Sequence, residues 1–120
     1  MKRDPLKFIL TLPPSVNRLW RMGRGKMYRS KNYEEWRTLS LWRLSCQMRG
    51  KTQITGHYRL RLEAVRPDRR KRDLGNLEKA AHDVLVAAEI VEDDSYCQVI
   101  ELAWVKAGPE CVIYLESLDD

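Results

Sequence analysis

Residues 57–64 alternate strictly between apolar and polar side chains. Tyr58, Leu60 and Leu62 fall on one side of an extended chain, while Arg59 and Arg61 fall on the other. Successive side chains of a β-strand point to opposite faces, so this period of two predicts a half-buried strand. Its outer face is polar and partly basic, which favours a sheet that is covered on one face only.

The rest of the chain supplies strands and helices to surround that strand. The expected order is a strand at 7–12 near a sheet edge, a basic loop at 15–26, a short strand at 27–29, a helix at 32–48, the strand at 57–64, a helix at 75–88, and strands at 96–106 and 111–116. The last two strands flank the turn Gly108-Pro109 and are predicted to form a terminal hairpin. These elements indicate an α/β (α+β) fold with a single mixed β-sheet, two helices packed on one face, and one domain over residues 1–120.

The helix at 32–48 has an unusually wide apolar surface. Asn32 and Glu35 have the spacing of a capping box, and Gly50 closes the segment. Two apolar arcs share the helix, the first made by Tyr33, Trp36, Leu41, Leu44 and Met48 and the second by Leu39, Trp42 and Cys46. This width predicts burial against the sheet. It also favours contact with a partner chain, although packing in the core alone explains the wide apolar surface nearly as well.

The composition excludes several classes of protein. The chain has 120 residues, of which 43% are hydrophobic and 32% charged, so it is not disordered or of low complexity. It has no apolar run of the ~20 residues that a membrane helix needs and no signal-peptide pattern, so a cytoplasmic location is expected. The cysteines Cys46, Cys97 and Cys111 form no C-x-x-C pair and are expected to be buried thiols. His57 and His82 are isolated and form no ligand pattern.

The charge changes sign abruptly between Arg72 and Asp73. Residues 1–72 contain 20 Lys and Arg against 5 Asp and Glu, whereas residues 73–120 contain 2 against 12, giving +15 and −10 and the net charge of +5. A basic face beside a cluster of carboxylates suits a protein that attracts a polyanion and holds a divalent cation against it. The alternative is an ordinary solvated surface with chance asymmetry.

The residues on the acidic side of this change are candidates for phosphodiester chemistry. Asp73 begins the predicted second helix, and Asp93 and Asp94 follow it. Mg²⁺ prefers carboxylate oxygens together with substrate phosphate, and Asp73 and Asp94 are of that chemical type. Lys79, about one and a half turns after Asp73, could contact the scissile phosphate or orient the attacking water. The helix is ~20 Å long, so its two ends converge only if the chain folds back along it.

Each of these residues also has a purely structural interpretation. Asp73 or Asn76 could cap the helix, Asp93 and Asp94 could be turn residues, and Lys79 could be a solvated helix side chain. Taken alone, these residues support the structural and the catalytic interpretation about equally.

One stretch of the chain reads RPDRRKRDLGNLEKAAHDVL and is followed by VEDDSYCQV. This stretch resembles the RusA family of Holliday-junction resolvases. The resemblance extends over essentially the whole chain, because it includes LTLPPSVNRLWR near the amino terminus. The family implies a homodimeric α/β endodeoxyribonuclease of phage or prophage origin that acts in DNA recombination and repair. It binds four-way DNA junctions and makes paired symmetric nicks with Mg²⁺, Mn²⁺ being the other candidate ion. The catalytic carboxylates of the family match Asp73 and Asp94, and its lysine matches Lys79. Asn76 and Asp93 also match the motif.

The chain departs from the family pattern at Gly75, where the family has its second acidic residue. Three outcomes are open. Glu78, one helical turn on, replaces the missing oxygen; or Asp93 or Glu92 moves in; or the site is degraded and the protein binds junctions without cutting them well. Rescue by a neighbouring carboxylate is favoured. The competing reading is therefore a non-catalytic or weakly catalytic junction-binding protein.

Two basic segments are the candidate DNA contacts. They comprise Arg18, Arg21, Arg24 and Lys26 in the first, and Arg69, Arg70, Lys71 and Arg72 in the second, with Asn76 beside it. Trp20 could stack on an unpaired base at the crossover or pack in the core instead. A four-way junction has approximate two-fold symmetry, and two opposed nicks need two sites related by a two-fold axis, so a homodimer is the expected assembly.

Overall fold

The computed structural model describes residues 5–14, 20–23, 26–29, 31–69 and 73–119. Their elements are β1 (Leu6–Leu10), β2 (Trp20–Gly23), β3 (Lys26–Arg29), α1 (Lys31–Gln47), β4 (Tyr58–Val65), α2 (Leu74–Ala87), a short 3-10 helix (Asp94–Tyr96), β5 (Cys97–Val105) and β6 (Cys111–Ser117). A four-stranded sheet has the order β1-β6-β4-β5, and β2 and β3 form a separate hairpin. The sheet is mixed, as predicted, because β4 pairs in parallel with β5 and antiparallel with β6.

The predicted terminal hairpin of β5 and β6 is wrong. β4 lies between these two strands and pairs with both, from Tyr58↔Cys97 on one side and Tyr58↔Ser117 on the other. The turn at Gly108-Pro109 leads the chain across the end of β4 instead of into a direct pairing. Strand β4 has a fully buried face, so a central position satisfies its backbone hydrogen bonds on both edges.

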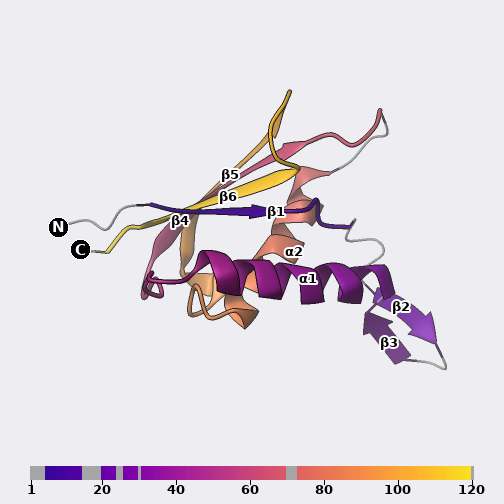
Figure 1. The fold of residues 1–120 in the computed structure, drawn as a ribbon. Coiled ribbons are helices and arrows are strands. Elements are labelled where there is room, and N and C mark those ends of the chain that lie inside the picture. The colour runs from indigo at the N-terminus through magenta and orange to yellow at the C-terminus, as the bar shows by residue number, and fades with distance from the viewer. Residues whose placement is uncertain (1–4, 15–19, 24–25, 30, 70–72, 120) are drawn as a thin grey trace.

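The two helices cover the same face of the sheet (Figure 1). Tyr58, Leu60, Leu62 and Ala64 of β4 are fully buried beneath them, which confirms the predicted inner face. On the other face Arg59 bonds Glu101 at 3.0 Å between Nη2 and Oε1, and Arg61 bonds Glu63 at 2.9 Å between Nε and Oε2. This alternation places the whole core between the helices and one side of the sheet.

The two apolar arcs of helix α1 face different surroundings, one the core and the other solvent. Tyr33, Trp36 and Leu44 are buried in the core, and Leu41 and Met48 pack against it. The second arc is exposed: Trp42 is 65% exposed and Leu39 38%. Helix α1 begins at Lys31, so Asn32 lies within its first turn rather than at its cap.

Strand β1 is at the edge of the sheet, as predicted, and its outer side is covered by one side chain of α1. The amide of Gln47 donates from Nε2 to the carbonyl oxygen of Ile9 and accepts at Oε1 from the Ile9 amide, both at 2.8 Å. Gln47 thus imitates the backbone of a neighbouring strand. An exposed edge is a template for pairing with other chains, and this contact occupies the backbone groups of one β1 residue, Ile9.

Three local predictions need correction. The segment predicted as a basic loop at 15–26 contains strand β2, which pairs antiparallel with β3. The predicted strand at 27–29 is confirmed within β3. Ile100 does not share the burial of Leu102 and Trp104, since it is 46% exposed on the edge strand β5. Among the thiols only Cys111 is buried, and Cys46 is exposed.

Within the described ranges, neither helix is long and apolar enough to cross a membrane.

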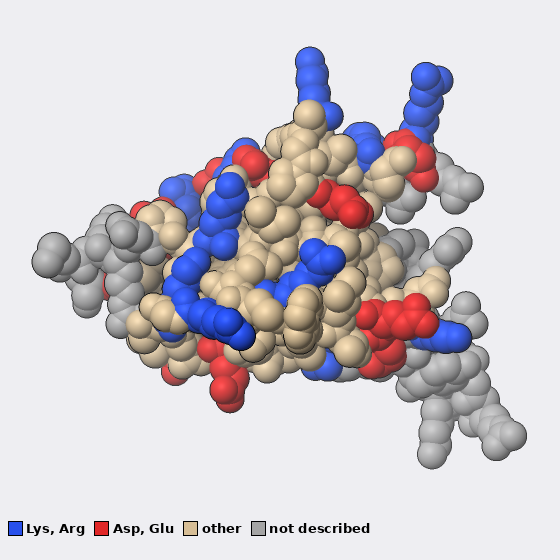
Figure 2. Space-filling view, viewed as in Figure 1, with Lys and Arg blue, Asp and Glu red and all other residues tan. Residues whose placement is uncertain are grey.

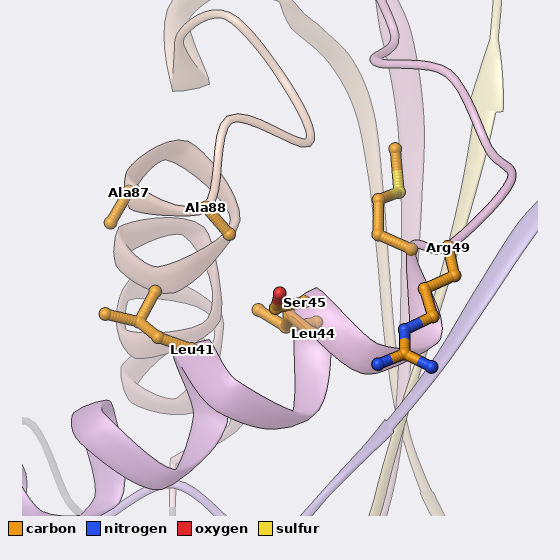
Figure 3. Close-up of a pocket in the computed structure, with 7 residues that line it drawn as sticks. Leu41, Leu44, Ser45, Arg49, Ala87 and Ala88 are labelled. Carbon is orange, nitrogen blue, oxygen red and sulfur yellow. The ribbon is translucent and has the colours of Figure 1, made fainter.

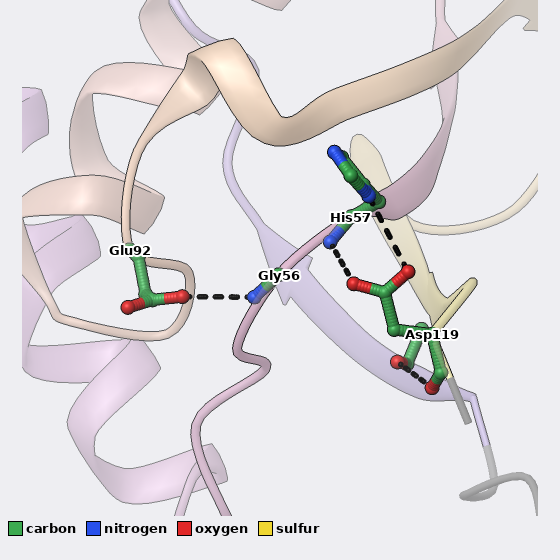
Figure 4. Close-up of polar contacts among 5 residues, drawn as sticks. Gly56, His57, Glu92 and Asp119 are labelled. Carbon is green, nitrogen blue, oxygen red and sulfur yellow. Dashed lines mark hydrogen bonds and ion pairs between the residues drawn. The ribbon is translucent and has the colours of Figure 1, made fainter.

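The segment before β4 is tied to the carboxyl-terminal residues (Figure 4). The Asp119 carboxylate accepts from the backbone N–H of His57 at 2.8 Å, and Glu92 accepts from the backbone N–H of Gly56 at 2.8 Å. Gly56 has a φ of +78°, a left-handed conformation that strains any residue with a side chain. A Cβ atom there would also collide with the carboxylate of Asp119.

We expect Gly56→Ala to destabilise the protein more than Gly50→Ala. Gly50 has a similar φ of +73°, but a Cβ atom at that position has nothing within 4 Å. The Gly50 variant should lose about 1 kcal/mol from backbone strain alone. The Gly56 variant adds the displacement of Asp119 and its hydrogen bonds. Urea unfolding of both variants measures the difference, and equal losses would show that the Asp119 contact contributes nothing.

Candidate active site

Asp73 stands at the start of α2 and caps it. Its Oδ1 accepts from the backbone N–H of Gly75 at 2.9 Å, and its own carbonyl oxygen accepts from the N–H of Asn76 at 3.2 Å. The structural role predicted for Asp73 is therefore real. The residue is exposed, so its carboxylate also faces solvent beside the basic segment that precedes it.

Asp93 and Asp94 lie in the turn that leads from α2 to β5. Asp93 caps the 3-10 helix, and its Oδ2 accepts from both the hydroxyl and the backbone N–H of Ser95. The Ser95 hydroxyl is the main reason that the pKa of Asp93 lies below its usual range. Asp94 is the first residue of the 3-10 helix and is exposed.

The chain does not gather the predicted carboxylates into one cluster. Asp73 precedes α2 and Asp94 follows it, and the 14 residues of α2 give a helix of about 21 Å. In the described part of the chain, no three His, Cys, Asp or Glu side chains are close enough to hold a metal ion together. The assignment of Asp73 and Asp94 to one metal site remains a prediction.

Between the two ends of α2 the structure contains a buried polar pair that the sequence analysis missed. Glu78 Oε1 lies 2.7 Å from Nδ1 of His82, whose side chain is only 5% exposed. The His82 ring lies against Tyr58, at 5.9 Å between centroids. In the sequence His82 forms no ligand pattern, but its spacing of four from Glu78 on one helix face is a signal for this pair.

Tyr58 links this pair to the turn that carries Asp94. Burial raises the pKa of the Tyr58 hydroxyl well above its usual range, and nearby negative groups raise it further, namely Cys97, Asp94, Asp93 and Glu78. Burial likewise raises the pKa of the Cys97 thiol. Glu78 is therefore the α2 carboxylate whose charge acts on the same buried hydroxyl as Asp93 and Asp94. Lys79 is exposed on the next position of α2.

The predicted DNA contacts are only partly described. Arg69 is exposed in the segment before α2, and Asn76 is half-buried in the first turn of that helix. Arg21 lies in β2 and Lys26 in β3. The remaining predicted contacts lie outside the described residues: Arg18, Arg24, Arg70, Lys71 and Arg72. The backbone places Trp20 at the start of β2.

The view from the α1 side shows blue cationic side chains across the face, with red carboxylates in separate groups (Figure 2). A groove lies between α1 and α2 and is lined by Leu41, Leu44, Ser45, Met48, Arg49, Ala87 and Ala88 (Figure 3). It is mostly apolar and contains none of the acidic residues discussed above. The groove therefore does not include any of the predicted site residues.

The fold and these side chains define an α+β protein with acidic residues on and around the helix that joins its two parallel strands, an arrangement suited to phosphodiester hydrolysis. A family model described as endodeoxyribonuclease RusA matches residues 11–116. The chain belongs to this family, whose members are enzymes that hydrolyse phosphodiester bonds. The resemblance seen in residues 66–99 is thereby confirmed.

The relatives that match include three proteins named crossover junction endodeoxyribonuclease RusA. The protein of Escherichia coli strain K12 is 36% identical over 97 residues, which cover 81% of this chain and 78% of the relative. That of Enterobacteria phage 82 is 35% identical over 97 residues, with the same coverage of 81% and 78%. That of Aquifex aeolicus strain VF5 is 29% identical over 108 residues, covering 88% of this chain and 85% of the relative.

The capping role of Asp73 can be separated from any chemical role by two substitutions. Asn caps a helix about as well as Asp, so Asp73→Asn should leave the free energy of unfolding nearly unchanged. Asp73→Ala removes the cap and should cost about 1 kcal/mol. Urea unfolding tests both variants. A large loss in Asp73→Asn would mean that the negative charge itself stabilises the fold.

Proposed function

We propose that this chain is a metal-dependent endonuclease that resolves four-way DNA junctions by paired symmetric nicks. The observation that supports it best is the placement of Asp73 just before α2, of Lys79 on it and of Asp94 after it, all within residues 11–116 that match the family. All three side chains are exposed. They are therefore accessible to a DNA backbone that approaches the ends of α2.

Mg²⁺ is the proposed ion, with Mn²⁺ as the second candidate. RusA-type nucleases in general depend on a divalent metal, and carboxylate oxygens are the ligands that Mg²⁺ prefers. The donor set fits this chemistry, since Asp73 and Asp94 present exposed carboxylates and no competing salt bridge is found for either among the described residues. When bound, the ion would polarise the phosphate and lower the pKa of a coordinated water.

The protein's own residues do the remaining work. Lys79 is an exposed cation on α2, six residues after Asp73, and we assign it the role of holding the scissile phosphate or orienting the attacking water. Arg69 and the basic residues that follow it attract the backbone through charge alone, so binding should weaken steeply with salt. Because the proposed substrate is DNA, we also propose that the protein acts inside the cell.

We further propose that the protein acts as a homodimer. Two opposed nicks in a junction of two-fold symmetry need two sites related by a two-fold axis. The exposed arc of α1, formed by Leu39, Trp42 and Cys46, is the candidate interface, because a Trp that is 65% exposed is unusual for a surface without a partner.

Cleavage is tested with a synthetic four-way junction and a matched linear duplex, with and without Mg²⁺. We expect paired nicks in the junction only, and only with metal. Asp94→Asn and Lys79→Met should each lower the rate by about two orders of magnitude or more while junction binding persists. Asp73→Asn should behave like Asp94→Asn. Metal-independent nicks, or full activity of Asp94→Asn, would contradict the proposed function.

Gly75 supports a second candidate function, that of a protein which binds junctions and cuts them poorly. One of the three carboxylates expected in the family is missing at this position. In that case the unmodified protein would bind the junction tightly with a strong salt dependence, and the same experiment would show no nicks at any metal concentration.

The dimer is tested by light scattering over a range of concentrations. The protein should have twice the monomer mass, and Trp42→Lys should shift it to the monomer because the charge cannot be buried at the interface. Thr52→Lys, at an exposed position in the loop beyond α1, serves as the control and should stay dimeric. A monomer at every concentration would contradict the proposed assembly.

A further inference from the structure

Arg66 lies over the ring of Trp104 at the point where β4 ends. Its guanidinium carbon Cζ is 4.6 Å from the centroid of the indole ring, which is within the range of a cation–π contact. Arg66 is exposed, and Trp104 is half-buried near the end of β5. The contact thus restricts an exposed cation to one place on the surface.

Arg66 differs from the two arginines within β4, which are both paired with carboxylates. Arg59 pairs with Glu101 at 3.0 Å. Arg61 pairs with Glu63 at 2.9 Å. Among the described residues, no carboxylate forms an ion pair with Arg66. A cation–π contact uses the face of the guanidinium group and leaves the N–H groups at its edge free to donate. Arg66 therefore keeps its charge and its donors for an anion.

The sheet places a second cation at the same end. Strands β4 and β5 are parallel, and their last paired residues are Val65 and Val105. The next residues, Arg66 and Lys106, therefore leave two neighbouring strands, which lie about 4.8 Å apart, at one end of the sheet. Lys106 is also exposed. Arg66 and Lys106 together are called the strand-end pair below.

Hydrogen bonds anchor the end of β4 to the turn before β6. The backbone N–H of Val65 donates to the carbonyl oxygen of Glu110 at 3.0 Å. The carboxylate of Glu110 accepts from the backbone N–H of Leu12 at 3.3 Å. The acidic side chain of this turn is thus bonded to a backbone group of another segment, and it does not neutralise the strand-end pair.

The strand-end pair lies where α2 begins. Trp104 is opposite Ala64, whose side chain is fully buried beneath the helices, so the indole lies on the helix-covered face of the sheet. Trp104 and Leu74, the first residue of α2, both pack against the same core cluster. Helix α2 crosses from the end of β4 back to the start of β5, so its first turn lies at this end of the sheet (Figure 1). A phosphate held by Arg66 would therefore lie at the end of α2 that Asp73 caps.

We propose that Arg66, positioned by Trp104 and assisted by Lys106, binds a phosphate of the DNA backbone and directs the strand toward the start of α2. The contact is additional to the basic run 69–72, for which the sequence predicts DNA binding. It carries no sequence preference, because a guanidinium group recognises phosphate oxygens and not base edges. This inference rests on the proposed function, to which it adds a binding residue, Arg66, and a positioning residue, Trp104.

The first test measures junction binding in EDTA, so that cleavage plays no part. Fluorescence anisotropy of a labelled four-way junction gives Kd over a range of NaCl concentrations. Arg66→Gln should weaken binding about tenfold at ~0.1 M NaCl and reduce the slope of log K against log salt by about one, as expected for the loss of one phosphate contact. Lys106→Gln should reduce the slope in the same direction. Arg59→Gln removes the same charge from a paired arginine, and this control should bind like the unmodified protein.

The second test separates positioning from packing. Trp104→Leu removes the aromatic face and should weaken junction binding about threefold, whereas Trp104→Phe keeps an aromatic ring and should bind nearly as well as the unmodified protein. In the Arg66→Gln background, Trp104→Leu should have no further effect on binding. Thermal melting of each variant monitors stability, and a role in packing alone would lower the melting temperature without this dependence on Arg66.

The outcomes distinguish the inference from the function on which it rests. If the unmodified protein cleaves junctions and Arg66→Gln binds them with an unchanged salt slope, the inference is overturned and the function stands. Equal losses in Arg66→Gln and Arg59→Gln would reflect net charge alone and would also overturn it. If the unmodified protein binds a junction but cleaves none, the nuclease function fails, and the salt slopes still decide whether Arg66 contacts a phosphate. A protein that binds no DNA at any salt concentration would overturn both.

Discussion

The pairing of β4 with two partners is the constraint on which the rest of the structure depends. β5 lies parallel on one side and β6 antiparallel on the other, and the inner face of β4 is fully buried. A parallel pair requires a long connection across the sheet, and α2 is that connection. The acidic residues stand before, within and after this helix, so the sheet topology itself determines how far apart they lie.

The candidate site is therefore arranged along a crossover helix rather than at one point. Asp73 caps the helix and Asp94 begins the turn beyond it, while Glu78 and His82 occupy its middle. These residues have structural roles that are seen directly, since Asp73 caps the helix and the buried His82 contacts Glu78. The proposed chemistry is assigned to the same helix and its flanking turns, and the remaining elements hold them in place.

The sequence predicted local structure well where a periodic pattern is tied to burial. The alternation in 57–64 identified the inner face of β4, and helical spacing identified both helices to within one or two residues. It failed where the outcome depends on contacts distant in sequence. Cys97–Val105 and Cys111–Ser117 have the pattern of a hairpin, and only the competition of β4 for both strands separates them. The Glu78–His82 pair is not predicted from the sequence, because its burial against Tyr58 depends on tertiary packing between α2 and β4.

The contact between Gln47 and Ile9 has a consequence for how copies of this chain can assemble. A sheet with two open edges can add strands from other molecules without limit, as in a fibril. Here the β1 edge is occupied by a side-chain amide, so β5 is the edge that remains for a neighbour in the four-stranded order. Growth through one edge stops at two copies, because a two-fold pairing uses that edge in both. The glutamine therefore hinders strand addition at β1, and association through β5 alone would close at two copies.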